Sequence, residues 1–135
     1  MEAAQLSLVL RNARLDEVVD TTLREWDGSD DAMIKRTVKW VKGLADEFLS
    51  LANEIQDPDE IRTSIAIQYI ELKSRWIALN TKVNYQTFRN GACNKEDGFR
   101  ASGISQLLAI IEPLIPQEDI DNITQFLCNP VRQAA

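Results

Sequence analysis

Hydrophobic residues recur at helical spacing along most of this chain. The clearest run follows alternating steps of four and three between about residues 30 and 56, at Ile34, Val38, Val41, Ala45, Phe48, Ala52 and Ile55. This period is typical of a helix that packs lengthwise against another helix. Met33, Trp40 and Leu44 widen the apolar face beyond a narrow seam, as in a globular bundle. The pattern therefore predicts a long, well-packed helix.

The next helix has a strong start signal. Asp57 is placed to cap it, and Pro58 suits the first helical position, where no hydrogen-bonded N–H is needed. The four-three alternation then continues to about Phe88, at Ile65, Tyr69, Leu72, Trp76, Leu79 and Val83. A second apolar side is formed by Ile61, Ile67, Ile70 and Ile77. A helix with two apolar sides lies centrally in a bundle or contacts a partner.

Three shorter apolar patterns account for most of the remaining chain. Residues 3–26 predict a first helix with a break near Asn12. Residues 103–115 predict a fourth helix, and Pro113 should kink or tighten its end. Residues 116–128 predict a short last helix.

Residues 89–102 carry the turn signals Asn90-Gly91 and Asp97-Gly98 instead of a helical pattern. They predict a loop of about fourteen residues, which is long for a connection between helices. The sequence as a whole predicts one all-α domain over residues 1–135. We expect a bundle of four to five helices, mostly antiparallel, with one long loop at about 89–102.

Composition narrows the class of protein. The chain of 135 residues is 44% hydrophobic and 27% charged, with a formal charge of -6, and the first two values are ordinary for globular domains. No apolar run approaches the ~18 residues that span a membrane, and the first residues include no basic region. Cys93 and Cys128 lack metal or redox spacing. We therefore expect a cytoplasmic protein with reduced thiols, no signal peptide and no membrane contact.

The absence of histidine removes several kinds of site. It excludes Ser-His-Asp and Cys-His catalysis and His-ligated metals within this sequence. Acidic residues gather where helices are predicted to begin, which indicates capping rather than calcium binding. Phosphate loops, dinucleotide fingerprints and nucleophile elbows are also missing. We therefore expect no enzyme, no metal and no cofactor.

One stretch of this acidic chain reverses sign. Between residues 61 and 95 a single acid, Glu71, stands against Arg62, Lys73, Arg75, Lys82, Arg89 and Lys95. Three of these bases, Arg75, Lys82 and Arg89, recur every seven residues. On a helix this spacing places them in one stripe about 21 Å long. A cationic stripe on an acidic protein indicates a defined docking surface.

Neighbouring residues extend this candidate surface. Tyr85 and Phe88 lie beside the last two bases of the stripe, and bases with exposed aromatics can grip single-stranded nucleic acid. Lys35, Lys39 and Lys42 form a second basic row on the preceding helix. If the two helices are antiparallel neighbours, the rows converge. The candidate nucleic-acid-binding residues are Lys35, Lys39, Lys42, Lys73, Arg75, Lys82 and Arg89.

A different interpretation fits the same residues. Long basic side chains can lie over a seam of the bundle and pair with carboxylates of a neighbouring helix. Tyr85 and Phe88 would then belong to the core. The exposure of these two aromatic side chains distinguishes the two interpretations.

The segment Ile70-Glu71-Leu72-Lys73-Ser74-Arg75, with the bases downstream of it, resembles a stretch of one known family. It is similar to a Leu-Lys-x-Arg-like stretch in the small subunit of type III CRISPR effector complexes. The resemblance covers only part of the chain. It implies a helical, noncatalytic subunit that lines an RNA-containing duplex as repeated copies, with backbone contacts from Lys73, Arg75, Lys82 and Arg89.

Two functions remain open at the level of sequence. The first is a noncatalytic subunit of a larger assembly that binds RNA or single-stranded DNA through its basic face. The alternative is a protein-protein interaction or homodimerisation module that binds no nucleic acid, in which the extra isoleucines of residues 57–88 form the contact. An enzyme would require carboxylates that converge in a cleft.

Overall fold

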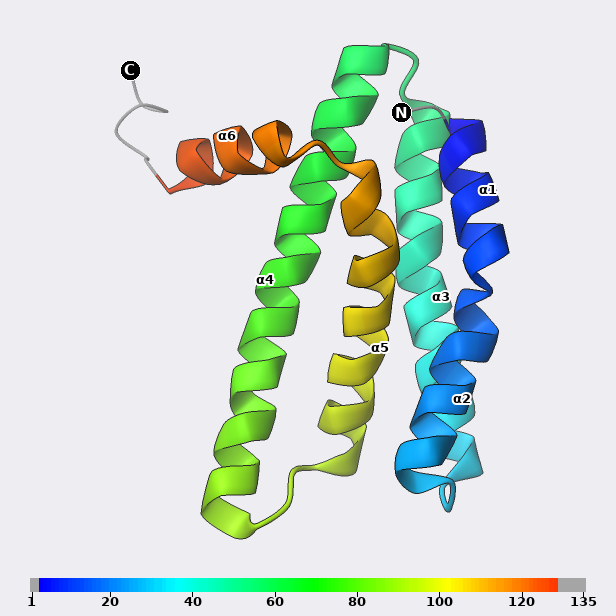
Figure 1. The fold of residues 1–135 in the computed structure, drawn as a ribbon, viewed down its shortest axis with the longest axis vertical. Helices are drawn as coiled ribbons and strands as arrows, with labels where there is room; N and C mark the ends of the chain where they lie inside the picture. The colour runs from blue at the N-terminus through cyan, green and yellow to red at the C-terminus, as the bar shows by residue number, and fades with distance from the viewer. Residues whose placement is uncertain (1–2, 129–135) are drawn as a thin grey trace.

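The computed structural model describes residues 3–128, and every regular element in that range is helical. All five predicted helical segments are present, which confirms the all-α bundle. The elements are α1 (Ala3–Ala13), α2 (Leu15–Asp27), α3 (Asp31–Glu54), α4 (Pro58–Asn90), α5 (Lys95–Ile111), the short 3-10 helix η1 (Glu112–Leu114) and α6 (Gln117–Leu127). Figure 1 shows α1 to α5 running lengthwise, with α6 lying across α4.

The first predicted segment is divided into α1 and α2 at Arg14. The backbone of Arg14 is left-handed, with φ 51° and ψ 52°, and this change of direction ends α1 before α2 begins. The Arg14 carbonyl nevertheless accepts the first hydrogen bond of α2, from the Val18 amide at 3.0 Å. The expected break near Asn12 therefore exists, but it lies two residues later and at a residue type that rarely adopts this conformation.

The two long helices begin at the caps that their sequences indicate. The Asp30 carboxylate accepts a hydrogen bond from the Met33 amide at 3.0 Å, and Asp57 accepts one from Asp59 at 2.9 Å. At the other end of α4, Gly91 adopts φ 80° and its amide donates to the Thr87 carbonyl. Glycine is suited to this left-handed C-cap because it has no Cβ.

The predicted loop at 89–102 is wrong over most of its length. Helix α4 extends to Asn90 and α5 begins at Lys95, so only residues 91–94 connect them. Asn94 caps α5 by accepting a hydrogen bond from the Asp97 amide at 3.1 Å. Gly98, which resembles a turn signal in the sequence, lies inside α5 against Trp26, where a Cβ would come within 2.5 Å of the indole ring. Tertiary packing therefore explains this glycine.

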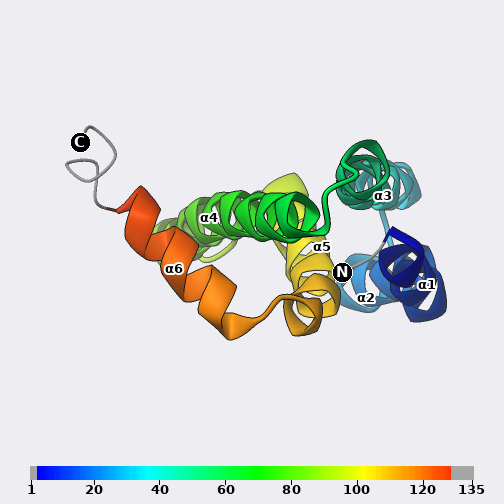
Figure 2. The same ribbon diagram turned by 90° about the horizontal axis from the view of Figure 1, so that it is seen from above.

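Helix α5 forms the centre of the bundle. It contacts α1, α2, α3 and α4, and it lies between the diverging ends of α3 and α4 in Figures 1 and 2. The largest fully buried side chains are Tyr69 on α4, Phe48 on α3 and Phe99 on α5. The core therefore consists of the apolar faces of α3, α4 and α5, together with buried residues of α1 and α2 such as Leu6 and Leu23.

Helix α6 is attached to α4 by a charged contact. The Arg62 guanidinium bonds both carboxylate oxygens of Asp119, one at 2.7 Å. Ile120 and Ile123 pack against the core from the same helix. Figure 2 shows α6 crossing α4 and ending beyond it, on the side away from α5. Within residues 3–128, no helix is long and apolar enough to cross a membrane.

Candidate functional site

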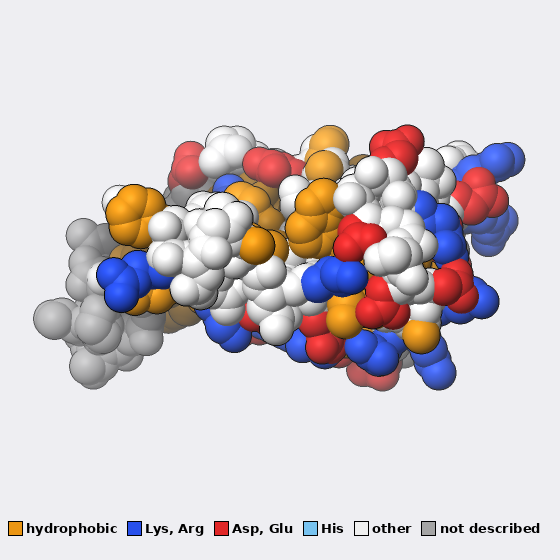
Figure 3. Space-filling model, turned by 90° about the horizontal axis from the view of Figure 1, so that it is seen from below, with side chains coloured by type: hydrophobic (Ala, Val, Ile, Leu, Met, Phe, Trp, Pro, Cys, Tyr) orange, Lys and Arg blue, Asp and Glu red, His pale blue; other side chains and the backbone are white. Residues whose placement is uncertain are grey.

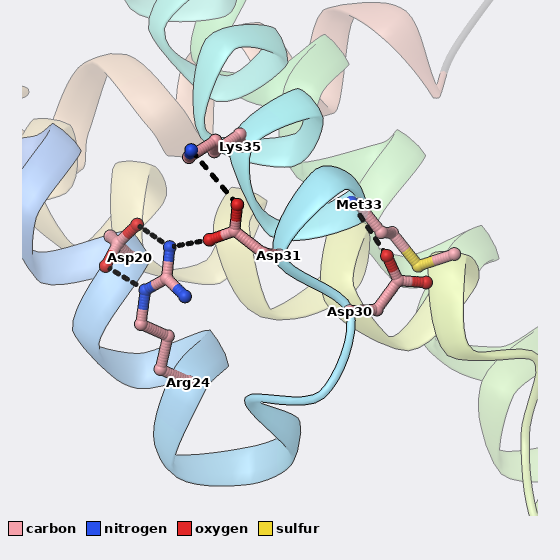
Figure 4. Close-up of polar contacts among 6 residues, drawn as sticks. All are labelled: Asp20, Arg24, Asp30, Asp31, Met33 and Lys35. Atoms are coloured by element: carbon pink, nitrogen blue, oxygen red, sulfur yellow. Dashed lines mark hydrogen bonds and ion pairs between the residues drawn. The ribbon is translucent and has the colours of Figure 1, made fainter.

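The basic row on α3 is largely engaged with neighbouring acids. Lys35 pairs with Asp31 at 3.0 Å, and Asp31 also binds Arg24 at 2.7 Å (Figure 4). Lys42 pairs with Asp16 of α2 at 3.7 Å. Lys39 forms no ion pair with any residue in the range 3–128. This row therefore lies beside α2, toward the N-terminal half of the molecule.

The bases on α4 divide into engaged and unpaired side chains. Lys82 pairs with Asp97 at the start of α5, at 3.1 Å. Lys73 lies over the Tyr69 ring, 5.8 Å from its centroid, in a cation-π contact. Arg75 and Arg89 form no ion pair with the described part of the chain. The α4 stripe therefore keeps two unpaired guanidinium groups, one near its middle and one at its end.

The two basic rows do not form one patch. The predicted convergence required the start of α3 to lie directly beside the end of α4. Figures 1 and 2 instead show α5 between them. The first turns of α5 also present acids to both helices, because Asp97 pairs with Lys82 and Glu96 approaches Arg36 at 3.9 Å. The rows at Lys35 and at Lys82 are therefore separate surfaces with acids between them.

Charge pairs at the turn between α2 and α3 shift several pKa values. Hydrogen bonds from Ser29 and then Lys95 hold the pKa of Asp27 well below its usual range. Arg24 and Lys35 lower the pKa of Asp31, and Asp20 together with Asp31 raises that of Arg24. These groups are all at least partly exposed to solvent, so their pairing contributes little to stability. They do, however, neutralise bases that would otherwise be open to an anionic ligand.

The side of α4 that faces away from α5 carries an uncharged seam. Its positions follow the four-three alternation and are Thr63, Ile67, Ile70, Ser74, Ile77, Thr81, Asn84 and Phe88, hereafter the α4 seam. Ile67 and Ile70 are half-buried in the half of α4 that α6 crosses. Beyond the crossing, Ile77 is 51% and Phe88 86% exposed, and Tyr85, which flanks the seam, is 63% exposed. The end of α4 thus presents apolar surface to solvent.

Seen from below in Figure 3, hydrophobic and basic side chains lie together at the edge formed by the end of α4. Acidic and basic side chains are mixed over the opposite end, where α2 turns into α3. The exposed aromatics contradict the interpretation in which Tyr85 and Phe88 belong to the core. The sequence pointed to this surface through Ile67, Ile70 and Ile77. The absence of charge at Thr81, Asn84 and Phe88, which continue the four-three alternation, would have extended the predicted surface to the end of α4.

A second surface is the groove between α2 and α4. Its volume is about 440 Å³, and its walls include Trp26, Trp76 and Val83, with Gly98 and Ser102 of α5 also lining it. Trp26 is half-exposed and meets Phe99 edge to face, with ring centroids 5.0 Å apart. The indole of Trp26 therefore contacts the core on one side and lines the groove on the other. None of the residues lining the groove is charged.

Acidic and thiol side chains are the remaining candidates for a metal site, because the chain has no histidine. Among residues 3–128, no cluster of three or more Cys, Asp or Glu side chains is arranged to hold a metal ion. Cys93 is half-buried and Cys128 is exposed, and both are free thiols. The strongest candidate for a functional site is therefore the exposed end of α4.

Comparisons with known proteins do not assign a function to this surface. No family model, curated protein or solved structure matches the chain. No match links the chain to the small subunits of CRISPR effector complexes.

Proposed function

We propose that this protein is a noncatalytic binding subunit of a larger assembly, and that it docks a protein partner through the exposed half of the α4 seam. The observation that carries the proposal is the uncharged row from Ile77 to Phe88, which α6 leaves uncovered. Single exposed apolar residues are common on protein surfaces, but three large ones near the end of one helix, Ile77, Tyr85 and Phe88, with no charge along the row, indicate an interaction site.

The energetics of the row favour a protein partner. Ile77, Tyr85 and Phe88 are each more than half exposed. Burying them would contribute on the order of 1–2 kcal/mol each through removal of apolar surface from water. Aromatic side chains are also the usual anchors of protein interfaces. A row of this kind matches the apolar face that a partner helix presents.

Native mass spectrometry of the chain purified from its own host tests the proposal. The wild-type chain should carry a second polypeptide, which the Ile77→Ser, Phe88→Ser double variant loses. Leu8→Ser is the matched control, because Leu8 is 52% exposed on α1, far from the seam. A wild-type chain that is always isolated as a single chain, with neither a different polypeptide nor a second copy bound, overturns the proposal.

Binding of a nucleic-acid backbone is the second candidate, and the exposure of Tyr85 and Phe88 beside Arg89 favours it. Arg75 and Arg89 form no ion pair within the described chain, so their charges are available to phosphates. Lys82 would first have to leave Asp97. The net charge of -6 also opposes general affinity for polyanions. The similarity to CRISPR small subunits belongs with this candidate.

A filter-binding titration with single-stranded RNA and DNA tests the second candidate. If it is correct, the triple variant Arg75→Ala, Lys82→Ala, Arg89→Ala should bind more weakly. The slope of log affinity against log salt should also become shallower, by about 0.7 per lost phosphate contact. The same affinity and the same slope in the triple variant would exclude this candidate.

A further inference from the structure

We infer that the partner of the α4 seam is a second copy of this chain, bound antiparallel through α4 with Thr81 on the two-fold axis. The inference rests on the proposed docking function of the seam and names the occupant. A symmetric dimer requires a surface that is complementary to itself, so that residue i contacts j and j contacts i. The seam meets this requirement in both shape and charge.

The antiparallel register places large side chains against small ones. With Thr81 on the axis, Ile77 lies opposite Tyr85 of the partner subunit, and Ser74 lies opposite Phe88 of the partner subunit. Each long aromatic side chain therefore meets a shorter residue, which allows the two helices to interdigitate. The contact runs from Ser74 to Phe88, about four helical turns, or roughly 21 Å. All of the intervening seam positions are uncharged.

The charges beside the seam favour this orientation. Glu71 and Arg89 are 18 residues apart, which is five turns of 3.6 residues, so they project at the same angle from α4. Antiparallel pairing brings Glu71 close to Arg89 of the partner subunit, with an axial offset of about 3 Å that a long arginine side chain can span. Neither side chain has an ion-pair partner within the described residues. Two symmetric ion pairs would flank the seam.

Parallel pairing lacks this complementarity. It would leave Glu71 and Arg89 of the partner subunit 18 residues apart, about 27 Å along the helix axis, so these two charges could not pair. In the antiparallel dimer, Lys82 approaches Lys82 of the partner subunit, but Asp97 neutralises each lysine within its own chain at 3.1 Å. The acid at the start of α5 thus offsets this repulsion. Arg75 has the same axial offset from Arg89 of the partner subunit as Glu71 has, but it projects about 40° further round the helix, away from the seam, so Glu71 is the nearer charge.

The size of the contact sets its expected strength. One helix face of four turns buries less than the ~800 Å² per partner of a standard interface. We therefore expect a dimer with a dissociation constant in the micromolar range. Helix α6 ends beyond α4 on the side away from α5, which is the side that the second copy would occupy (Figures 1 and 2). The exposed Leu127 near its end is available to enlarge the interface.

Sedimentation equilibrium of the purified chain alone tests the inference. Between about 5 and 200 µM, a range around the expected micromolar constant, the mass should rise from one 15.3 kDa chain toward two. Ile77→Ser should weaken association at least tenfold, whereas the matched Leu8→Ser control should not. A wild-type chain that stays at one chain mass throughout this range overturns the inference.

Charge exchange tests the register independently of apolar contact. Glu71→Arg and Arg89→Glu should each weaken the dimer severalfold, and the double exchange should restore most of the loss, because both symmetric pairs are then re-formed with reversed sign. No rescue in the double exchange argues against this register.

Cysteine cross-linking distinguishes the two orientations. In a Cys93→Ser, Cys128→Ser background, Thr81→Cys should form an intermolecular disulfide, because residues on the axis approach within the 4.4–6.8 Å of Cα atoms in a disulfide. Ser74→Cys should not cross-link, because its own copy lies far along the helix. Faster cross-linking at position 74 than at position 81 overturns the antiparallel arrangement.

The results separate the inference from the proposed function. A pure chain that remains monomeric, while the chain from its host carries a different polypeptide that Ile77→Ser, Phe88→Ser removes, overturns the dimer and leaves the docking function intact. A chain that is monomeric when pure and carries no other polypeptide when isolated from its host overturns both the dimer and the docking function.

Discussion

Gly103 of α5 lies so close to Val41 of α3 that a Cβ at position 103 would come within 2.5 Å of the valine Cγ2. Both residues are buried. The absence of a side chain at Gly103 therefore sets how closely the central helix approaches α3. A glycine inside a helix costs stability relative to alanine, and this contact gives the physical reason for keeping it.

Gly103→Ala should destabilise the fold, by about 1–2 kcal/mol, because overpacking exceeds the gain in helix propensity. Gly43→Ala is the matched control. Gly43 lies inside α3 with no atom within 4 Å of its ideal Cβ, so alanine there should stabilise the protein by about 0.5–1 kcal/mol. Urea denaturation of both variants measures the difference. Equal stabilisation by the two substitutions would show that α5 does not approach α3 so closely.

Arg14→Gly should stabilise the protein by about 1 kcal/mol, because a left-handed backbone strains any residue that has a Cβ. The φ of 51° at Arg14 is the only positive value at a non-glycine residue among those described. Asn12→Gly is the control and should destabilise, since Asn12 lies within α1. Thermal melts of both variants would reveal the opposite signs.

Tyr69→Phe should leave stability unchanged or raise it by up to about 1 kcal/mol, because an unpaired buried hydroxyl is unfavourable. The Tyr69 hydroxyl is buried without a hydrogen-bond partner among the described residues. Burial, followed by the nearby Glu112 carboxylate, raises the pKa of Tyr69 to about 12. Tyr85→Phe is the control and should have no effect, because Tyr85 is exposed. A marked loss of stability in Tyr69→Phe would reveal a hydrogen bond to this hydroxyl.

Acid should weaken the attachment of α6 to α4, because the contact between Arg62 and Asp119 requires an ionised carboxylate. Hydrogen bonds from Arg62 lower the pKa of Asp119 in the folded protein, so the folded state favours the ionised carboxylate. The resulting stability is present above the unfolded pKa of about 3.9 and is lost as pH falls through the lower folded value. Asp119→Asn should therefore reduce the melting temperature at pH 7 and flatten its decline in acid.

The control for the acid prediction is Glu54→Gln, since Glu54 forms no ion pair within residues 3–128. Melting curves recorded between about pH 7 and 2.5, a range that brackets the unfolded carboxyl pKa, provide the comparison. A decline in Asp119→Asn as steep as that of the wild type would assign the acid sensitivity to other carboxylates.

The two long helices could be predicted from the sequence because their capping residues and their apolar spacing lie within the helices themselves. Asp57 and Pro58 start α4, and Ile34, Val41 and Phe48 of α3 are buried as their spacing indicates. The start of α5 is not indicated by the sequence pattern, because Gly98 is explained by its contact with Trp26 of α2, which lies far earlier in the chain. Single-sequence patterns do not contain that contact.

The candidate site was predictable only in part, for a related reason. Helical spacing placed Arg75, Lys82 and Arg89 on one stripe, but whether each base meets an acid depends on tertiary packing. Asp97 reaches Lys82 only because α5 begins eight residues earlier than expected. The same early start places α5 between the two basic rows and keeps them apart.

The central position of α5 also bears on the order in which the protein can fold as it is synthesised. Helices α1 to α4 are synthesised first, yet each of them packs partly against α5, which ends at Ile111. The lower half of α4 diverges from α3 and has α5 as its neighbour (Figure 1). A nascent chain that stops short of α5 therefore exposes both apolar sides of α4 at once, a state prone to aggregation. Completion of the bundle must wait until most of the chain has left the ribosome.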